Sequence, residues 1–218
     1  MTPTAFDREF QFIGDDLVQM SRLVEDAIEQ SIQALLDRNL ALANQVIAND
    51  VKVNELRFKL EEACLTLIAT RQPIAGDLRA VVAAMHIIDE LERMGDHAAG
   101  IAKTVVLMSD EPLLKTIKKI PRMAELSRKM LAECIQAFMA RDAGWARQIA
   151  AQDAEMDQMY RSVFEKLVEV MAENKKLVTP ATYLMWCAHN LERIADRVTN
   201  IAERVIFMAT GDLRELNA

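Results

Sequence analysis

The sequence contains few residues that interrupt helices and few that favour strands. It has 6 Gly and 5 Pro among 218 residues, and only 5% of the residues are aromatic. Good helix formers such as Ala, Leu, Met, Glu, Gln and Arg dominate instead. The composition therefore predicts an all-α protein.

Other absences limit where the protein acts. Its three cysteines, Cys64, Cys134 and Cys187, form no C-x-x-C pair, and their apolar neighbours predict buried, reduced thiols in a reducing compartment. No basic segment followed by an apolar one opens the chain, and no apolar run reaches 18 residues, so we expect neither a secretion signal nor membrane insertion. A net charge of -7 argues against a nucleic-acid partner. We expect a cytoplasmic protein.

Amphipathic helices account for most of the first half. Apolar residues recur every three or four positions from Phe6 to Leu35 and again from Leu42 to Leu67, which is the helical period. The segments DRN at 37–39 and RQPIAG at 71–76 interrupt this pattern. We expect Asp77 to be the N-cap of a third helix that continues to about Met108.

The pattern of the first half recurs in the second. After a basic connector, SDEPLLKTIKKIP at 109–121, the first two helical stretches recur at an offset of 103 residues and the third at an offset of 100. Thr179 and Pro180 are suited to begin the last helix as N-cap and first helical residue, and Gly211 is suited to end it. We predict two tandem three-helix bundles, as domains 1–109 and 110–218, with six antiparallel helices each about 45 Å long.

Pairs of acidic residues also recur. Residues 91–102, LERMGDHAAGIA, and 191–202, LERIADRVTNIA, share six of twelve residues. The shared residues place Glu92 beside Asp96, and Glu192 beside Asp196, one turn apart on a helix face. The second helix of each half carries a matching pair, Asp50 with Asn54 and Asp153 with Asp157.

These pairs admit two interpretations. If the second and third helices of each half pack antiparallel, four oxygen-bearing side chains face one another, which suits a hard or borderline cation. The alternative is a solvated charged stripe held by Arg93 and Arg193. The spacing required for a di-iron oxidase, Glu-x-x-His on two helices, is absent, as are the usual catalytic motifs. Metal storage or metal-dependent catalysis of ferritin type, and a purely structural scaffold, both remain open at this point.

The chain has two three-helix repeats and contains the segments RQPIAGDLR at 71–79, DELERMGDHAAGIA at 89–102 and NLERIADRVTNIA at 190–202. In these features it resembles the PhoU family over essentially its whole length. That resemblance implies metal clusters on the acidic pairs. By position, the ligands would be Asp50, Glu92, Asp96, Asp153, Asp157, Glu192 and Asp196, with Asn54, Asp89, His189 and Asn200 as possible additional ligands. The chain departs from the family pattern at Asn54, where an aspartate is expected, and at Gly100, which aligns with Asn200.

The same resemblance implies a regulator rather than an enzyme. Members of this family link the phosphate-specific ABC transporter to a sensor histidine kinase, keep the phosphate-starvation response off when phosphate is plentiful, and restrain phosphate uptake. We therefore expect divalent or trivalent metal ions such as iron, zinc, manganese or magnesium, a homodimer, and docking on the cytoplasmic parts of membrane proteins at the inner face of the membrane. From carboxylate charge alone, the second half is expected to bind metal more tightly than the first.

Overall fold

The computed structural model describes residues 4–114 and 118–212, and within these ranges the chain is helical, with no strand. Three long helices come first: α1 (Ala5–Asp37), α2 (Leu40–Arg71) and α3 (Ala75–Leu107). They are followed by α4 (Ile120–Ala140), α5 (Ala143–Ala150), α6 (Asp153–Glu173), a short 3₁₀ turn η2 (Lys175–Leu177) and α7 (Val178–Thr210). The predicted all-α fold is confirmed.

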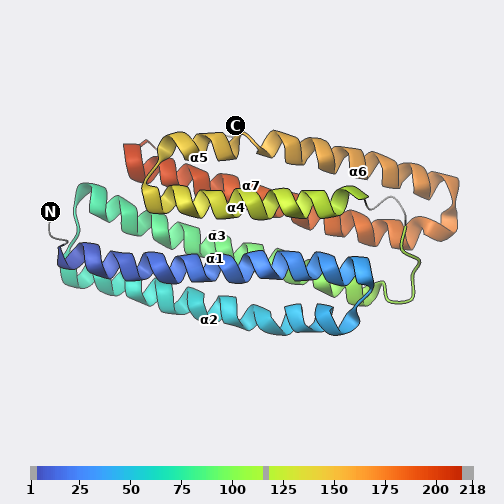
Figure 1. Cartoon of the computed structure of the whole chain (residues 1–218), viewed down its shortest axis with the longest axis horizontal. Helices are drawn as coiled ribbons and strands as arrows, with labels where there is room; N and C mark the ends of the chain where they lie inside the picture. Colours follow the sequence, from blue (N-terminus) through green and yellow to red (C-terminus); the bar gives the residue numbers. More distant parts are fainter. Residues whose placement is uncertain (1–3, 115–117, 213–218) are drawn as a thin grey trace.

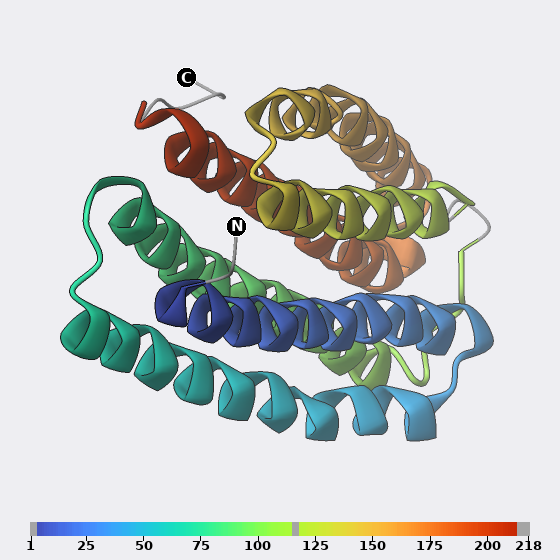
Figure 2. The same ribbon diagram turned by 60° about the vertical axis from the view of Figure 1, so that its left-hand side comes forward.

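The helices form two elongated bundles lying side by side (Figure 1). Helices α1, α2 and α3 pack on one another, as do α4, α5, α6 and α7. The bundles meet chiefly through α3 and α7, with α1 beside α4, and the turned view in Figure 2 separates the two groups clearly. One apolar core includes residues of both bundles. The division into domains 1–109 and 110–218 therefore stays a prediction.

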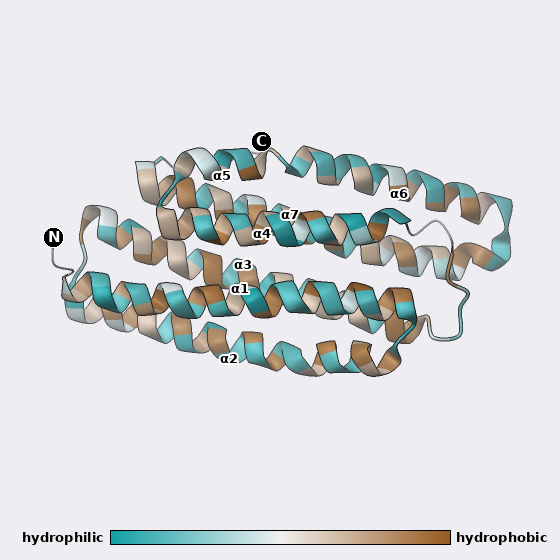
Figure 3. Cartoon of the chain, in the orientation of Figure 1, coloured by the Kyte–Doolittle hydropathy of each residue, from teal (hydrophilic) through white to brown (hydrophobic). Residues whose placement is uncertain are grey.

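Amphipathic periodicity explains why the helices pack this way. In α1, Leu17, Met20, Val24 and Ile28 are all fully buried at steps of three or four residues. Polar and apolar residues alternate in short bands along the helices (Figure 3), as this period requires. The predicted burial of the thiols is confirmed for Cys64, Cys134 and Cys187.

The offset of 103 is visible in the backbone. Arg38 and Arg141 both adopt the left-handed conformation, at φ 54°, where the first helix of each half ends. The next helices then start alike, because Asn39 accepts a hydrogen bond from the Leu42 N–H and Asp142 accepts one from the Trp145 N–H. Equivalent positions in the two halves thus cap the helices in the same way.

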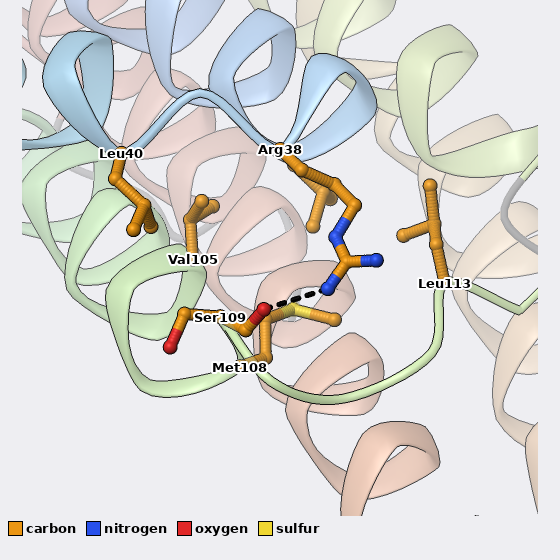
Figure 4. Close-up of a pocket in the computed structure, with 7 residues that line it drawn as sticks. Arg38, Leu40, Val105, Met108, Ser109 and Leu113 are labelled. Carbon is orange, nitrogen blue, oxygen red and sulfur yellow. Dashed lines mark hydrogen bonds between the residues drawn. The ribbon is translucent and has the colours of Figure 1, made fainter.

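The connector between the halves is held to the end of the first bundle. The Arg38 guanidinium donates hydrogen bonds to the Ser109 carbonyl at 2.6 Å and to the Glu111 carbonyl at 3.0 Å. Figure 4 shows this side chain reaching across a small pocket to Ser109, with Leu40, Val105, Met108 and Leu113 around it. The left-handed turn at Arg38 therefore both ends α1 and fixes the start of the connector; residues 115–117 lie outside the described part.

Two expectations about where helices begin were wrong. Helix α3 begins at Ala75 after Ile74, so Asp77 is not the N-cap but lies in the first turn, where its charge still complements the helix dipole. Helix α7 begins at Val178, which places Thr179 and Pro180 in its first turn, where the missing N–H of proline has no helical partner to lose. Gly211 ends α7 with φ 83°, as predicted.

The second half is also less regular than expected. Helix α4 has 21 residues, and the single helix expected after it is divided into α5, with 8 residues, and α6, with 21. Both residues at the break, Ala151 and Gln152, keep right-handed helical dihedral angles. With neither Gly nor Pro at the break, the sequence offers no signal for it. Within the described residues, no helix is long and apolar enough to cross a membrane.

Candidate metal sites on the acidic helix faces

The second-half cluster consists of Asp153, Asp157, Glu192 and Asp196. The first two lie at the start of α6, the other two lie in the middle of α7, and these helices pack on one another. Burial, the largest cause, and the negative charges of the other three members together raise the pKa of Glu192 to about 7, although Arg193 opposes the increase. Burial also raises the pKa of Asp196. The structure therefore brings the four predicted carboxylates into one electrostatic environment.

One oxygen in this cluster lacks a hydrogen bond. Oε2 of Glu192 is buried and accepts none, although the Nδ1 of His189 lies 3.2 Å away without hydrogen-bond geometry. The His189 ring in turn lies 6.0 Å from the Tyr160 ring, measured between centroids. A buried carboxylate oxygen without a hydrogen bond is unfavourable unless a cation or a proton reaches it.

The donors of the second-half cluster suit a metal ion chemically. They comprise carboxylate oxygens and, from His189, an imidazole nitrogen, and Asn200 lies one turn beyond Asp196 on the same helix. Within the described residues, no three His, Cys, Asp or Glu side chains converge closely enough to hold a metal ion as they lie. Arg193 meanwhile donates a hydrogen bond to Asp196 at 3.0 Å. Coordination would require these exposed and half-buried side chains to turn toward a common point.

The first-half cluster consists of Asp50, Asn54, Glu92 and Asp96. Burial raises the pKa of Asp50, and the charge of Asp96 adds to the increase, so these two lie near each other. Gly95 permits this approach, because a Cβ at that position would lie 3.3 Å from Oδ1 of Asp50. Asn54 donates a hydrogen bond to Oδ2 of Asp50 at 3.3 Å, so its amide nitrogen faces the carboxylate.

Arg57, which sequence reasoning missed, contacts the remaining acid of the first-half cluster. Its Nη1 lies 3.0 Å from Oε1 of Glu92, and its Nε lies 2.8 Å from Glu61 and 3.7 Å from Asp89. The sequence did contain a signal, since Arg57 follows Asn54 by three residues and precedes Glu61 by four, which places all three on one helix face. The first-half donors therefore fit a metal less well than those of the second half.

The arginines expected to hold the charged stripes behave differently. Arg193 does pair with the second-half cluster through Asp196, whereas Arg93 lies 4.0 Å from Glu90 instead. Gly100, the other departure from the family pattern, lies against the opposite bundle. A Cβ there would lie 3.3 Å from the side-chain oxygen of Asn190, so the missing side chain makes room at the seam between the halves.

Comparison with known proteins gives one consistent family. The model of the PhoU domain matches residues 17–105 and 120–205. A phosphate-specific transport system accessory protein PhoU homolog of Rhizobium meliloti (strain 1021) is 35% identical over 95% of this chain and 88% of its own length. The Zymomonas mobilis homolog of the same name is 36% identical over 96% of this chain and 89% of its own length.

Solved structures agree with this. The crystal structure of the phosphate transport system regulatory protein PhoU from Streptococcus pneumoniae superposes with a TM-score of 0.91 at 31% identity, covering 97% of this chain and all of the other. The crystal structure of PhoU from Pseudomonas aeruginosa superposes with a TM-score of 0.90 at 30% identity, covering 95% of this chain and 100% of the other. The likeness thus extends through both bundles.

Proposed function

The chain belongs to the PhoU family, and from this premise we propose that it restrains phosphate uptake and keeps the phosphate-starvation response off when phosphate is plentiful. One observation carries the proposal: both repeats match the family's domain, and relatives that align along nearly the whole chain are named accessory proteins of the phosphate-specific transport system. On this proposal the protein is a regulator, not an enzyme.

The proposed mode of action is docking. The protein would bind the cytoplasmic parts of the phosphate ABC transporter and of a phosphate-sensing histidine kinase, at the inner face of the membrane, and so report the state of one to the other. The pair of elongated bundles supplies long helix faces for such contacts. The names of the relatives support the contact with the transporter, and the contact with the kinase is an additional proposal.

Phosphate uptake tests the proposal directly. In a strain lacking the gene, we expect the initial rate of labelled phosphate uptake from phosphate-rich medium to rise several-fold, and the wild-type gene supplied in trans should restore the low rate. An uptake rate that is the same with and without the gene would count against the proposal.

We also propose that the second-half cluster binds a divalent or trivalent cation. The support is its donor chemistry and the buried Oε2 of Glu192 that accepts no hydrogen bond. Replacing Glu192 with Gln and Asp196 with Asn should abolish binding of Mn²⁺ in equilibrium dialysis. The matched variant E92Q/D96N in the first half should keep it. Equal loss from both variants would refute the assignment to the second half.

Self-association is proposed through an exposed face of α2. Val51, Phe58 and Leu65 recur at seven-residue steps and are 54%, 62% and 56% exposed. A seven-residue apolar stripe on a helix is the seam of a helix–helix interface. We expect a dimer in sedimentation velocity runs and a monomer after replacement of Phe58 and Leu65 with Ser. Replacement of Leu107, which is 60% exposed at the end of α3, serves as the control and should leave the dimer intact.

A further inference from the structure

A small pocket lies where the first bundle meets the connector. Its volume is about 120 Å³, and its lining includes Leu35, Val105 and Met108, which are 1%, 3% and 5% exposed. The Arg38 side chain reaches across the pocket toward Ser109 (Figure 4). Apolar side chains that border a cavity lack contacts on one side, so a ligand of matching shape would gain packing there.

The internal repeat contains a counterpart of this junction at the other end of the molecule, where α1 begins and α4 ends (Figure 1). Residues that line the pocket have counterparts there at the offsets of 103 and 100 residues. The pairs are Leu35 with Phe138, Arg38 with Arg141, Ser109 with Phe6, Leu113 with Phe10, Val105 with Val205, and Met108 with Met208. Arginine, valine and methionine thus occur at both ends, whereas three phenylalanines correspond to two leucines and a serine.

Three aromatic rings fill the counterpart junction. The Phe6 and Phe10 rings are stacked with their centroids 5.7 Å apart, and the Phe138 ring meets Phe10 edge to face at 6.3 Å. The Arg141 guanidinium lies over the Phe10 ring, with its central carbon 5.9 Å from the ring centroid, which is the geometry of a cation–π interaction. This end of the molecule therefore supplies its own aromatic rings.

The leucines and the serine leave room at the pocket that phenylalanine rings take up at the counterpart. An apolar cavity of about 150 Å³ holds benzene, so the pocket, at about 120 Å³, is of the size of one aromatic ring. The Arg38 guanidinium donates hydrogen bonds to the Ser109 and Glu111 carbonyls through its edge. A guanidinium that donates through its edge can still stack on a ring through its face.

We propose that this pocket binds one aromatic ring, with Arg38 against the face of the ring as Arg141 lies against Phe10. The proposal goes beyond phosphate regulation and uses none of the residues of the acidic clusters. An uncharged aromatic ring is common to small aromatic compounds and to a phenylalanine side chain of a partner protein, and separate probes distinguish these two sources.

NMR of the methionine methyl groups detects such binding directly. Met108 lines the pocket, and its signal is identified by its absence from the spectrum of Met108→Leu. Benzene should shift this signal to a saturating value through its ring current, while the signal of the counterpart Met208 stays in place. Cyclohexane has a similar size but no aromatic face, so it should compete with benzene about tenfold less well.

Filling the pocket from within should abolish the effect. Leu113→Phe and Leu35→Phe each introduce the phenylalanine of the counterpart position, so benzene should no longer shift the Met108 signal in either variant. Leu113→Phe should also melt at a higher temperature than the wild type, because its ring fills the cavity. Leu126→Phe, at a partly buried leucine of α4 outside the pocket, is the control and should keep the wild-type response.

A blocked pentapeptide of alanines with one central phenylalanine distinguishes the two sources of the ring. If the pocket receives a side chain of a partner protein, the peptide should shift the Met108 signal as benzene does. If the pocket serves a small aromatic compound, benzene should shift the signal and the peptide should not.

Three results would overturn the inference. One is a wild-type Met108 signal that benzene leaves unchanged, and another is cyclohexane that competes with benzene equally well. The third is a benzene-induced shift of wild-type size in both Leu113→Phe and Leu35→Phe, after circular dichroism has verified that they are folded. The first two results need only the wild-type protein, so they decide the matter even where a variant fails to fold.

Discussion

Individual side chains decide what the two acidic faces can do. Glu92 and Glu192 occupy equivalent positions in equivalent helices, yet one contacts a guanidinium and the other has a buried oxygen without a hydrogen bond. A buried charge is favourable only when it is paired, and Arg57, three positions after Asn54, provides that pairing for Glu92, whereas the equivalent residue in the second half is the uncharged Tyr160.

The raised pKa of Glu192 predicts a dependence of stability on pH. Since this pKa, about 7, lies above the ordinary value of 4.5, the contribution to stability is complete below about pH 4.5 and is lost as the pH rises through 7. Converting the whole pKa shift into free energy gives about 3 kcal/mol of stability, and solvent screening of this partly exposed group reduces that contribution to about 1 kcal/mol. In EDTA, Glu192→Gln should therefore be more stable than the wild type at pH 8.

Urea unfolding at pH 8 and at pH 4.5 measures this difference. At pH 4.5 both side chains are neutral in the folded protein, so the gain should be absent. The variant Glu125→Gln, an exposed acid of α4 outside the cluster, controls for the loss of a charge as such. A Glu192→Gln variant whose stability relative to the wild type is the same at both pH values would contradict the raised pKa.

The three thiols provide an independent test of the core. Burial raises the pKa of Cys64 and Cys187 to about 12 each, and raises that of Cys134 as well. Because the thiolate is the reactive form, the folded protein should release almost no thionitrobenzoate from Ellman's reagent at pH 8 within minutes. All three cysteines should react in guanidinium chloride. A fast-reacting thiol in the native state would show that the core is open there.

At the scale of helices, the sequence predicts the structure where a single helical period of apolar residues dominates. It does not predict the structure where contacts with neighbouring helices determine it. The stripe of α1 and its end near residues 37–39 follow from local sequence, and so does the glycine end of α7. The break between α5 and α6 does not, because Ala151 and Gln152 are good helix formers with no stop signal. The ion pairs of Arg57 depend on how α2 meets α3, which periodicity leaves undetermined.

The seam between α3 and α7 carries two contacts related by the repeat. Glu90 and Asn190 are equivalent at the offset of 100, and so are His97 and Arg197. In one contact, Arg197 lies 3.3 Å from Glu90, and both side chains are about 15% exposed, at 16% and 14%. In the other, Nδ1 of His97 lies 2.9 Å from the side-chain oxygen of Asn190. The two equivalent pairs of positions thus both join the bundles, one through an ion pair and the other through a hydrogen bond between histidine and asparagine.

Breaking the charged contact should destabilise the protein. Replacing Arg197 with Met leaves Glu90 nearly buried, with only Arg93 at 4.0 Å. We expect the free energy of unfolding to fall by about 3 kcal/mol, the lower end for a broken buried ion pair. The double variant E90L/R197M should recover most of this loss, since no unpaired charge remains. Urea unfolding measures both variants, and a double variant as unstable as R197M would refute the explanation.

At the scale of the whole molecule, the duplication was readable from the sequence and its asymmetry only in part. Two offsets, 103 and 100, predicted two bundles, and Asn54 indicated a weaker first cluster. The position of Arg57 among three acids emerged only from the packing of α2 on α3. The two bundles thus share one framework, but only the first half has an arginine of its second helix in contact with the glutamate of its third.

The central claim is that this molecule signals that phosphate is plentiful. The most direct measurement is alkaline phosphatase activity, as a reporter of starvation genes, in phosphate-rich cultures of the deletion strain with and without the gene in trans. We expect high activity without the gene and activity at the repressed, wild-type level with it. Repressed activity in the deletion strain itself would contradict the claim.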